Sequence, residues 1–163
     1  MRVLGRTHDD AAGEAYDKTA RLLGLPYPGG PELDRLARTG NPKAYAFPRY
    51  RPAGNALDFS FSGLKTSVRY FLESAAGREA APADVAASFQ AAVVDALMTQ
   101  LQAAFERARY NAVVVSGGVA ANSALASAVT AWSRRDGVPV FIPPPKSVSY
   151  THLMCIRDRT NSP

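Results

Sequence analysis

The stretch Val113-Val-Val-Ser-Gly-Gly-Val-Ala-Ala-Asn122 decides the fold of this chain. A run of β-branched residues ends at two adjacent glycines, and apolar residues then recur at helical spacing at Leu125, Val129 and Trp132. The pattern predicts a strand, a glycine turn and an amphipathic helix in succession. Such a turn lets a phosphate or nucleotide approach the backbone, because glycine lacks a Cβ and the first helical amides have no partner. A plain turn between a strand and a helix uses glycines in the same way, so both interpretations stay open here.

Hydrophobic periodicity on either side predicts an α/β domain with a helical leader. The leader helix is expected to run to about Leu23, with Thr7 or Asp9 as its cap and Gly24 as its stop. A short helix at 32–38 and an irregular crossing at 39–56 are expected next. The later elements are expected in the order β-α-α-β-α-β. They are a strand at 57–61, a helix at 63–73, a long helix at 82–109, a strand at 112–115, a helix to about 135 and a strand at 138–142. The strand at 112–115 lacks polar alternation, which predicts that both of its faces are covered.

Composition sets the outer bounds of the function. The chain has 163 residues, of which 47% are hydrophobic and 20% charged, which is typical of a globular protein with one core. The net charge of +5 permits a polyanionic partner but does not require one. No apolar run is long enough to span a bilayer, and the first residues hold no signal-peptide core. The single cysteine, Cys155, excludes an internal disulfide, and together these features predict a cytoplasmic location.

Four segments of the chain carry longer recognisable strings. They are the stretch from Asp9 to Asp34, then Asp58-Phe-Ser-Phe-Ser-Gly-Leu-Lys65, Ser116-Gly-Gly-Val-Ala-Ala-Asn122 and Phe141-Ile-Pro-Pro-Pro-Lys146. In this order they resemble the tRNA N6-adenosine threonylcarbamoyltransferase family, formerly described as O-sialoglycoprotein endopeptidases or glycoproteases. The resemblance covers about residues 2–146 and implies a partial ASKHA fold, the class of actin, sugar kinases and Hsp70. Residues 1–56 would be a helical segment and crossing from the first lobe, and residues 57–146 the C-terminal lobe.

The resemblance also implies a reaction. In this family a threonylcarbamoyl group moves from threonylcarbamoyl-AMP to N6 of adenosine 37, in tRNAs that read codons beginning with adenine. The exocyclic amine of adenine is a weak nucleophile, so the enzyme must bring the reactants together and stabilise the developing oxyanion. The family implies a divalent metal, iron or zinc, as the Lewis acid. The implied partners are the adenylate, tRNA and, in bacteria, an inactive paralogous subunit and a P-loop ATPase subunit, with no membrane.

Two substrate-binding residues are implied in the first segment. Asp17 matches an aspartate that would accept hydrogen bonds from ribose hydroxyls, and Gly30 matches a glycine whose missing side chain would leave room for the nucleotide. Without the resemblance, an exposed pair with Arg21 at i+4 is the preferred explanation of Asp17, and the resemblance reverses that preference. For Gly30, a plain turn would be equally plausible without the resemblance.

Further substrate-binding residues are implied at Asp34 and Asn122, the latter closing the glycine loop. Gly117 and Gly118 would form the backbone floor beside the phosphate. A pair with Arg38 is the alternative for Asp34, and the N-cap of the following helix is the alternative for Asn122.

The segment at 35–51 combines cations with aromatic rings, and these residues are Arg35, Arg38, Lys43, Arg49 and Arg51 with Tyr45, Phe47 and Tyr50. Cations for phosphates and rings for stacking are typical of nucleic-acid binding, so this segment is a candidate for contact with the tRNA anticodon arm. The alternative is a solvated loop whose rings pack on the domain. Ser60, Ser62 and Lys65 belong to a family string, and no catalytic role is assigned to them.

Several family features have no counterpart in this chain. The paired metal histidines, His-x-x-x-His, and a Ser-Gly-Gly-His-Thr loop are expected upstream of residue 1, and a third metal ligand is expected after Lys146. Neither His8 nor His152 has a partner at metal-ligand spacing, so no metal or catalytic residue is assigned. Residues 147–163 break the family pattern, which favours a non-native tail, such as sequencing-adaptor read-through, over a genuine divergent one. We therefore expect a poorly soluble fragment, lacking the N-terminal part and the true C-terminus and inactive by itself.

The sequence also bears on three other functions. A metallopeptidase would need His-Glu-x-x-His or a comparable site, which the sequence lacks. A kinase or ATPase of the same fold would bind ATP and hydrolyse it. A catalytically inactive nucleotide-binding or partner-binding ASKHA module is the main alternative.

Overall fold

The computed structural model describes residues 3–53, 57–108 and 110–142, and helices form most of this part of the chain. The elements in chain order are α1 (Ala12–Leu22), α2 (Gly29–Ala37), α3 (Ser62–Glu73), α4 (Ala75–Arg78), α5 (Pro82–Ala108), β1 (Val113–Val114), the 3₁₀ turn η1 (Gly118–Ala121), α6 (Ser123–Asp136) and β2 (Val140–Phe141). The expected tail at 147–163, with His152 and Cys155, lies outside the described residues, as does the Pro-Pro-Pro-Lys end of the fourth family segment.

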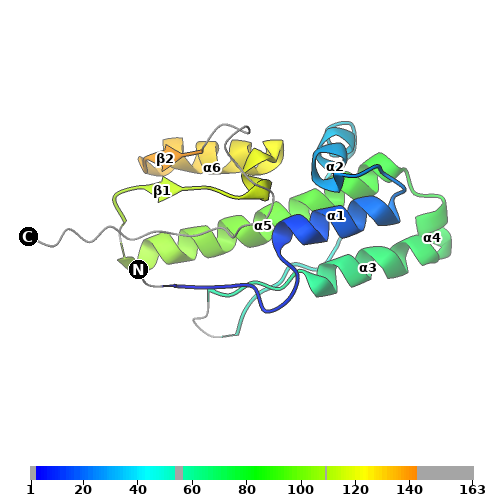
Figure 1. Cartoon of the computed structure of the whole chain (residues 1–163), viewed down its shortest axis with the longest axis horizontal. Helices are drawn as coiled ribbons and strands as arrows, with labels where there is room; N and C mark the ends of the chain where they lie inside the picture. Colours follow the sequence, from blue (N-terminus) through cyan, green and yellow to red (C-terminus); the bar gives the residue numbers. More distant parts are fainter. Residues whose placement is uncertain (1–2, 54–56, 109, 143–163) are drawn as a thin grey trace, which may run out of the picture.

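The long helix α5 organises the core. It extends along most of the long axis, with α1, α2 and α3 around one half and α6 with the strands beside the other half (Figure 1). Apolar side chains at intervals of four put one buried stripe along the helix, and they are Val85, Phe89, Val93, Leu97 and Leu101. Full burial of a side chain of this size contributes about 1.5–3 kcal/mol.

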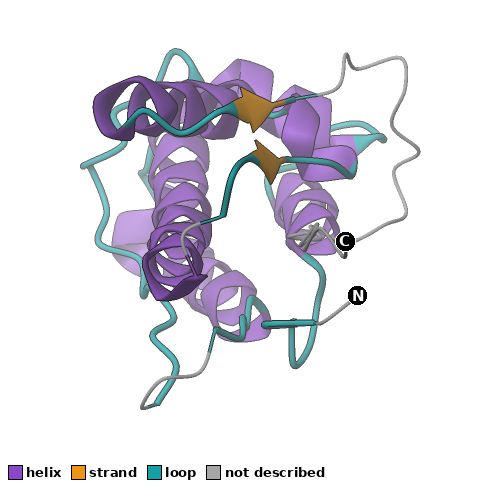
Figure 2. Ribbon diagram, turned by 90° about the vertical axis from the view of Figure 1, so that its left-hand side faces the viewer, coloured by secondary structure: helices purple, strands orange, loops and turns teal. Residues whose placement is uncertain are grey.

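The two strands form a parallel β-α-β unit around α6. Val113 pairs with Val140 and Val114 with Phe141, and the strands lie side by side when viewed along the long axis (Figure 2). Val113 is 2% exposed, whereas Val114 is 42% exposed and Phe141 is 62% exposed. The expectation that both faces of the first strand are covered was therefore wrong for the described part of the chain. Successive side chains point to opposite faces, and only one face meets the helical core.

The start of α1 also differs from the expectation. Its N-cap is Ala11, which makes no side-chain hydrogen bond, and neither Thr7 nor Asp9 caps it. The Asp9 carboxylate instead accepts hydrogen bonds from the amides of Phe61 (2.8 Å) and Ser62 (3.2 Å), at the start of α3. A carboxylate satisfies any free helical amide it can reach, and tertiary contact brings α3 closer to Asp9 than the turn of its own helix. Gly24 ends α1 as expected, with a φ of +71°.

Two further boundaries were wrong. The expected strand at 57–61 is reduced to a single parallel bridge between Thr7 and Phe59. Among the described residues, no extended partner strand lies beside it. Helix α2 begins at Gly29 and not near residue 32, because the first turn of a helix tolerates glycine and proline. The short helix α4 lies in the connection before α5, and the described part of the crossing, 39–53, is irregular as expected.

Candidate functional site

Asp17 and Gly30 lie together where α1 passes the start of α2. The Asp17 Oδ1 atom accepts a hydrogen bond from the Gly30 amide at 3.0 Å, which places a carboxylate at the positive end of α2. Within the described ranges Asp17 makes no ion pair, so the expected alternative of a pair with Arg21 does not form. The carboxylate is partly exposed, and its second oxygen has no protein hydrogen bond in this part of the chain.

The two adjacent glycines have different surroundings. A Cβ on Gly29 would lie 2.5 Å from the Ala20 Cβ and 3.0 Å from the Asp17 Cα, so this glycine lets α1 and α2 approach each other. A Cβ on Gly30 would meet no described atom within 4 Å. The position beside Asp17 is therefore open.

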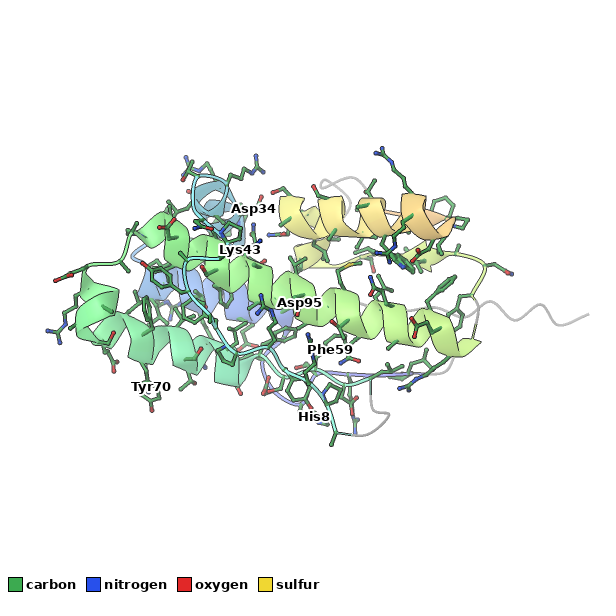
Figure 3. All side chains as sticks on the ribbon, turned by 180° about the vertical axis from the view of Figure 1, so that it is seen from behind. His8, Asp34, Lys43, Phe59, Tyr70 and Asp95 are labelled. Carbon is green, nitrogen blue, oxygen red and sulfur yellow. The ribbon has the colours of Figure 1, made fainter. Side chains whose placement is uncertain are left out.

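Asp34 and Asn122 form a second pair, at the start of α6. The Asn122 Nδ2 atom donates to Asp34 Oδ1 at 3.1 Å, and its Oδ1 accepts from the Leu125 amide at 2.9 Å. Asp34 lies between α2 and the N-terminal end of α6 (Figure 3). Its Oδ2 is 2.9 Å from Arg38 Nη2. Both structural alternatives from the sequence are thus present, since Asn122 caps α6 and Asp34 pairs with Arg38.

The sequence did not identify the residues that surround this pair. Gln90 of α5 accepts from Asn122 Nδ2 at 2.7 Å and from the Tyr16 hydroxyl at 3.5 Å, through the same Oε1 atom. The Ser123 hydroxyl and amide donate to Asp34 Oδ1 at 2.7 and 3.2 Å. A glutamine on the apolar side of a long helix, next to Phe89, was the available signal.

Burial keeps the Tyr16 hydroxyl protonated. Loss of solvent, and then the charge of Asp34, raise the pKa of Tyr16 well above its ordinary value. The phenol is 2% exposed and so remains a hydrogen-bond donor to Gln90 at any working pH.

The glycine loop leads directly into this pair. Gly117 has a φ of 97°, a conformation that favours glycine, and Gly118 begins η1. The Asn122 amide donates to the Val119 carbonyl at 3.0 Å, which holds the end of the loop. Val119 lies 3.7 Å from the position of a Cβ on Gly13, so the loop also touches α1.

The family string at 58–65 binds the N-terminal segment. The hydroxyls of Ser60 and Ser62 both donate to the Asp9 carboxylate. Lys65 Nζ lies 3.2 Å from Asp10, which also pairs with Lys18 at 2.7 Å. Partial burial of Asp9 opposes its charge, but hydrogen bonds from both serines and from backbone amides outweigh it and lower the pKa of Asp9 to about 2. These contacts give Ser60, Ser62 and Lys65 a structural role.

The cations of the 35–51 segment mostly have acidic partners. Arg49 Nε and Arg51 Nη2 lie 3.1 and 2.9 Å from one oxygen of Asp95 on α5. Arg38 pairs with Asp34, and Arg35 pairs with Glu32. Lys43 has no acidic partner among the residues that the structure describes (Figure 3 labels Lys43 and Asp95). Two arginines on one carboxylate leave a net positive charge at the surface.

Two of the three aromatic rings of this segment pack inward. The Tyr45 ring centroid lies 4.5 Å from that of Phe71 on α3, and the Phe47 centroid lies 5.6 Å from it. Phe47 is buried and Tyr45 is half-buried. These two rings therefore follow the alternative of packing on the domain, whereas Tyr50 is half-buried and the side chains of Lys43, Arg49 and Arg51 are exposed.

The described residues do not fit the metal centre that the family implies. They hold no group of three or more histidine, cysteine, aspartate or glutamate residues that could bind a metal ion. His8 Nε2 lies 3.2 Å from Asp58 Oδ2, as an isolated pair. In the same part of the chain, no helix is both long and apolar enough to cross a membrane.

The parallel β-α-β unit, its glycine turn and the helices packed on it define a partial α/β protein. Residues 1–154 match the family described as TsaD, tRNA N6-adenosine threonylcarbamoyltransferase. The chain belongs to this family, which confirms the resemblance seen in the sequence.

Individual relatives agree with this assignment. A tRNA N6-adenosine threonylcarbamoyltransferase of Moorella thermoacetica is 55% identical over 145 residues, covering 88% of this chain and 42% of the relative. Proteins with the same name from Kosmotoga olearia and Anaeromyxobacter dehalogenans are each 51% identical, over 88% of this chain and 43% of the relative. The chain thus spans less than half the length of the curated relatives it matches.

Proposed function

We propose that this chain is part of a transferase that moves the threonylcarbamoyl group from threonylcarbamoyl-AMP to N6 of adenosine 37 in tRNA. The observation that supports it is the arrangement around α2, where Asp17 contacts Gly30 and Asp34 contacts Asn122. Residues that the family resemblance assigned to one substrate come from widely separated parts of the sequence, and each of them lies on α2 or contacts it. Family membership and relatives of the same name support the reaction.

The proposed roles follow from the hydrogen-bonding capacity and open space that the protein's own contacts leave unused at these residues. The second oxygen of Asp17 accepts from the ribose hydroxyls, and the open side of Gly30 admits the sugar. One lone pair of Asn122 Oδ1 remains for the ligand, because the other caps α6. Asp34 holds Asn122 in place, and Gly117 and Gly118 lie beside the phosphate.

The metal chemistry of the proposed reaction would take place in segments of the parent protein outside this chain. The divalent metal, iron or zinc, would supply Lewis-acid chemistry there, and no step is assigned to it in this chain. The cations at Lys43, Arg49 and Arg51 contact the phosphates of the tRNA partner. A bacterial parent would also contact an inactive paralogous subunit and a P-loop ATPase subunit, and would work in the cytoplasm, where its tRNA substrate is.

A chimera tests the proposal. Residues 3–142 replace the matching segment of the Moorella thermoacetica relative, and transfer from threonylcarbamoyl-AMP to tRNA is followed by nucleoside analysis. We expect activity, and we expect Asp17→Ala to raise KM for the adenylate about tenfold or more through loss of a charge-assisted hydrogen bond. Glu14→Ala is the matched control, because Glu14 is a carboxylate on the exposed side of the same helix. A folded but inactive chimera, or equal effects of the two variants, would reject the proposal.

The alternative is an inactive ASKHA module that binds a nucleotide or a protein partner. The neighbouring exposed side chains of Val114 and Phe141 favour a partner-binding role. Under this alternative the chimera folds and binds a partner subunit but transfers nothing.

A further inference from the structure

Gln90 occupies the centre of a buried polar network that joins α1, α2, α5 and α6. We infer that Gln90 is a positioning residue, which holds the Asn122 side-chain amide in its ligand-binding orientation, and that Tyr16 holds Gln90. The inference rests on the proposed function, because it concerns the residues proposed to bind the adenylate.

The orientation of the Asn122 amide is determined by three neighbours. Its oxygen accepts from the Leu125 amide, while its nitrogen donates to Asp34 at 3.1 Å and to Gln90 at 2.7 Å. In the reversed orientation, the NH₂ group of Asn122 would point at the Leu125 N–H group, and its oxygen would point at the oxygens of Asp34 and Gln90. Each of those contacts is repulsive, so only the observed orientation is stable.

Gln90 is held by a donor that cannot change its role. The Tyr16 hydroxyl is 3.5 Å from the same Oε1 atom that accepts from Asn122, and burial raises the pKa of Tyr16. Gln90 is 6% exposed and Asn122 is 7% exposed, so water does not readily replace a lost partner. A buried donor without an acceptor is unfavourable, and this penalty favours a change in the orientation of the amide.

Removal of Gln90 should therefore act through Asn122. Leucine at position 90 has a similar volume but no acceptor, which leaves one Asn122 N–H without a partner. The amide can then rotate to satisfy that N–H, and the free lone pair of Oδ1 no longer points in one direction. Affinity for the adenylate should fall further than the loss of stability explains.

The experiment uses the full 163-residue chain, with threonylcarbamoyl-AMP as the calorimetric probe. We expect Gln90→Leu to weaken binding about tenfold or more, and Tyr16→Phe by about threefold because its contact is longer. Val93→Ala is the matched control, since Val93 lies one turn further along α5, is 0% exposed and has no side-chain polar atom that could join the network. It should lower thermal stability and leave affinity unchanged.

A spectroscopic readout accompanies the affinities. In the unchanged chain, both side-chain amide protons of Asn122 should exchange slowly with water in NMR spectra, because both are donated to buried acceptors. One of them should exchange quickly in Gln90→Leu, and neither should do so in Val93→Ala.

The outcomes separate the inference from the proposed function. If Asn122→Ala weakens binding while Gln90→Leu behaves like Val93→Ala, the positioning role is wrong and the proposed site stands. If Asn122→Ala binds as tightly as the unchanged chain, or the unchanged chain binds no adenylate, the proposed site fails and the inference fails with it. Should Gln90→Leu not fold, Tyr16→Phe decides, and unchanged affinity and amide exchange in that variant would overturn the inference.

Discussion

Neighbouring glycines at 29 and 30 show how one residue type serves two purposes. Gly29 is buried where α1 crosses α2, and its missing Cβ leaves the space that Ala20 occupies. Gly30 faces an open position and presents its amide to Asp17. The local sequence treats the two residues alike, yet one serves packing and the other borders the proposed ligand.

Substitution of each glycine by alanine should separate these roles. Gly29→Ala should lower the free energy of unfolding by about 1–3 kcal/mol, because the new methyl would overlap Ala20. Gly30→Ala should leave stability unchanged or raise it by up to about 1 kcal/mol, since alanine favours the helix, and should weaken adenylate binding. Urea unfolding and calorimetry measure both quantities. Equal destabilisation by the two variants would contradict the assignment.

At several helix N-termini of this protein, side chains that are distant in the sequence accept hydrogen bonds from the free backbone amides. Asp9 binds the first amides of α3, and Asp17 binds an amide at the start of α2. Asn122 caps α6 from its own chain position. Carboxylates at helix N-termini are favourable because the amides there carry partial positive charge. The arrangement of the helices is thus stabilised by contacts at their ends as well as by the hydrophobic core.

The cap on α3 predicts a pH dependence. The folded-state pKa of Asp9 is about 2, below its ordinary value of 3.8, so the carboxylate stabilises the fold above about pH 4. That contribution is lost as the pH falls through 2. Asp9→Ala should cost about 1 kcal/mol at pH 7, typical of a lost cap, and the difference from the unchanged chain should narrow between pH 4 and pH 2. Urea midpoints across this range measure it, and a difference independent of pH would refute the role of the charge.

At the scale of the whole molecule, the segment after α2 runs along α5. The Asn41 amide donates to Asp84 at 2.7 Å, the Tyr45 amide donates to Ser88 at 3.1 Å, and Asp95 then pairs with Arg49 and Arg51. These contacts progress along both segments in the same direction. The segment therefore follows α5, and Arg49 and Arg51 lie together at Asp95.

Neutralising Asp95 should strengthen RNA binding if Arg49 and Arg51 contact phosphates. Asp95→Asn releases both arginines, so tRNA affinity should rise and the slope of log K against log salt should steepen by about one to two. Glu106→Gln is the control, because it removes the same charge from an exposed position on α5. Filter binding over a salt series measures the effect. Equal results for the two variants would indicate a net-charge effect only.

The uncovered face of the small sheet should govern solubility. Val114 and Phe141 are neighbours in the parallel register and are both exposed. Val114→Thr combined with Phe141→Ser should reduce self-association of the chain in analytical ultracentrifugation. Tyr70→Ser is the control, since Tyr70 is 58% exposed on α3, away from the sheet. A highly soluble monomeric unchanged chain would contradict the expectation of poor solubility.

The sequence by itself determined the family, the glycine turn between β1 and α6, the long helix α5 and the end of α1 at Gly24. Periodicity and glycine chemistry are local, so they can be read along the chain. Only the tertiary structure decided that Asp9 caps α3, that Asp17 meets Gly30 and that Gln90 holds Asn122. A local pattern specifies which face of an element is buried but not which distant polar group it meets there, because those partners depend on how the helices cross.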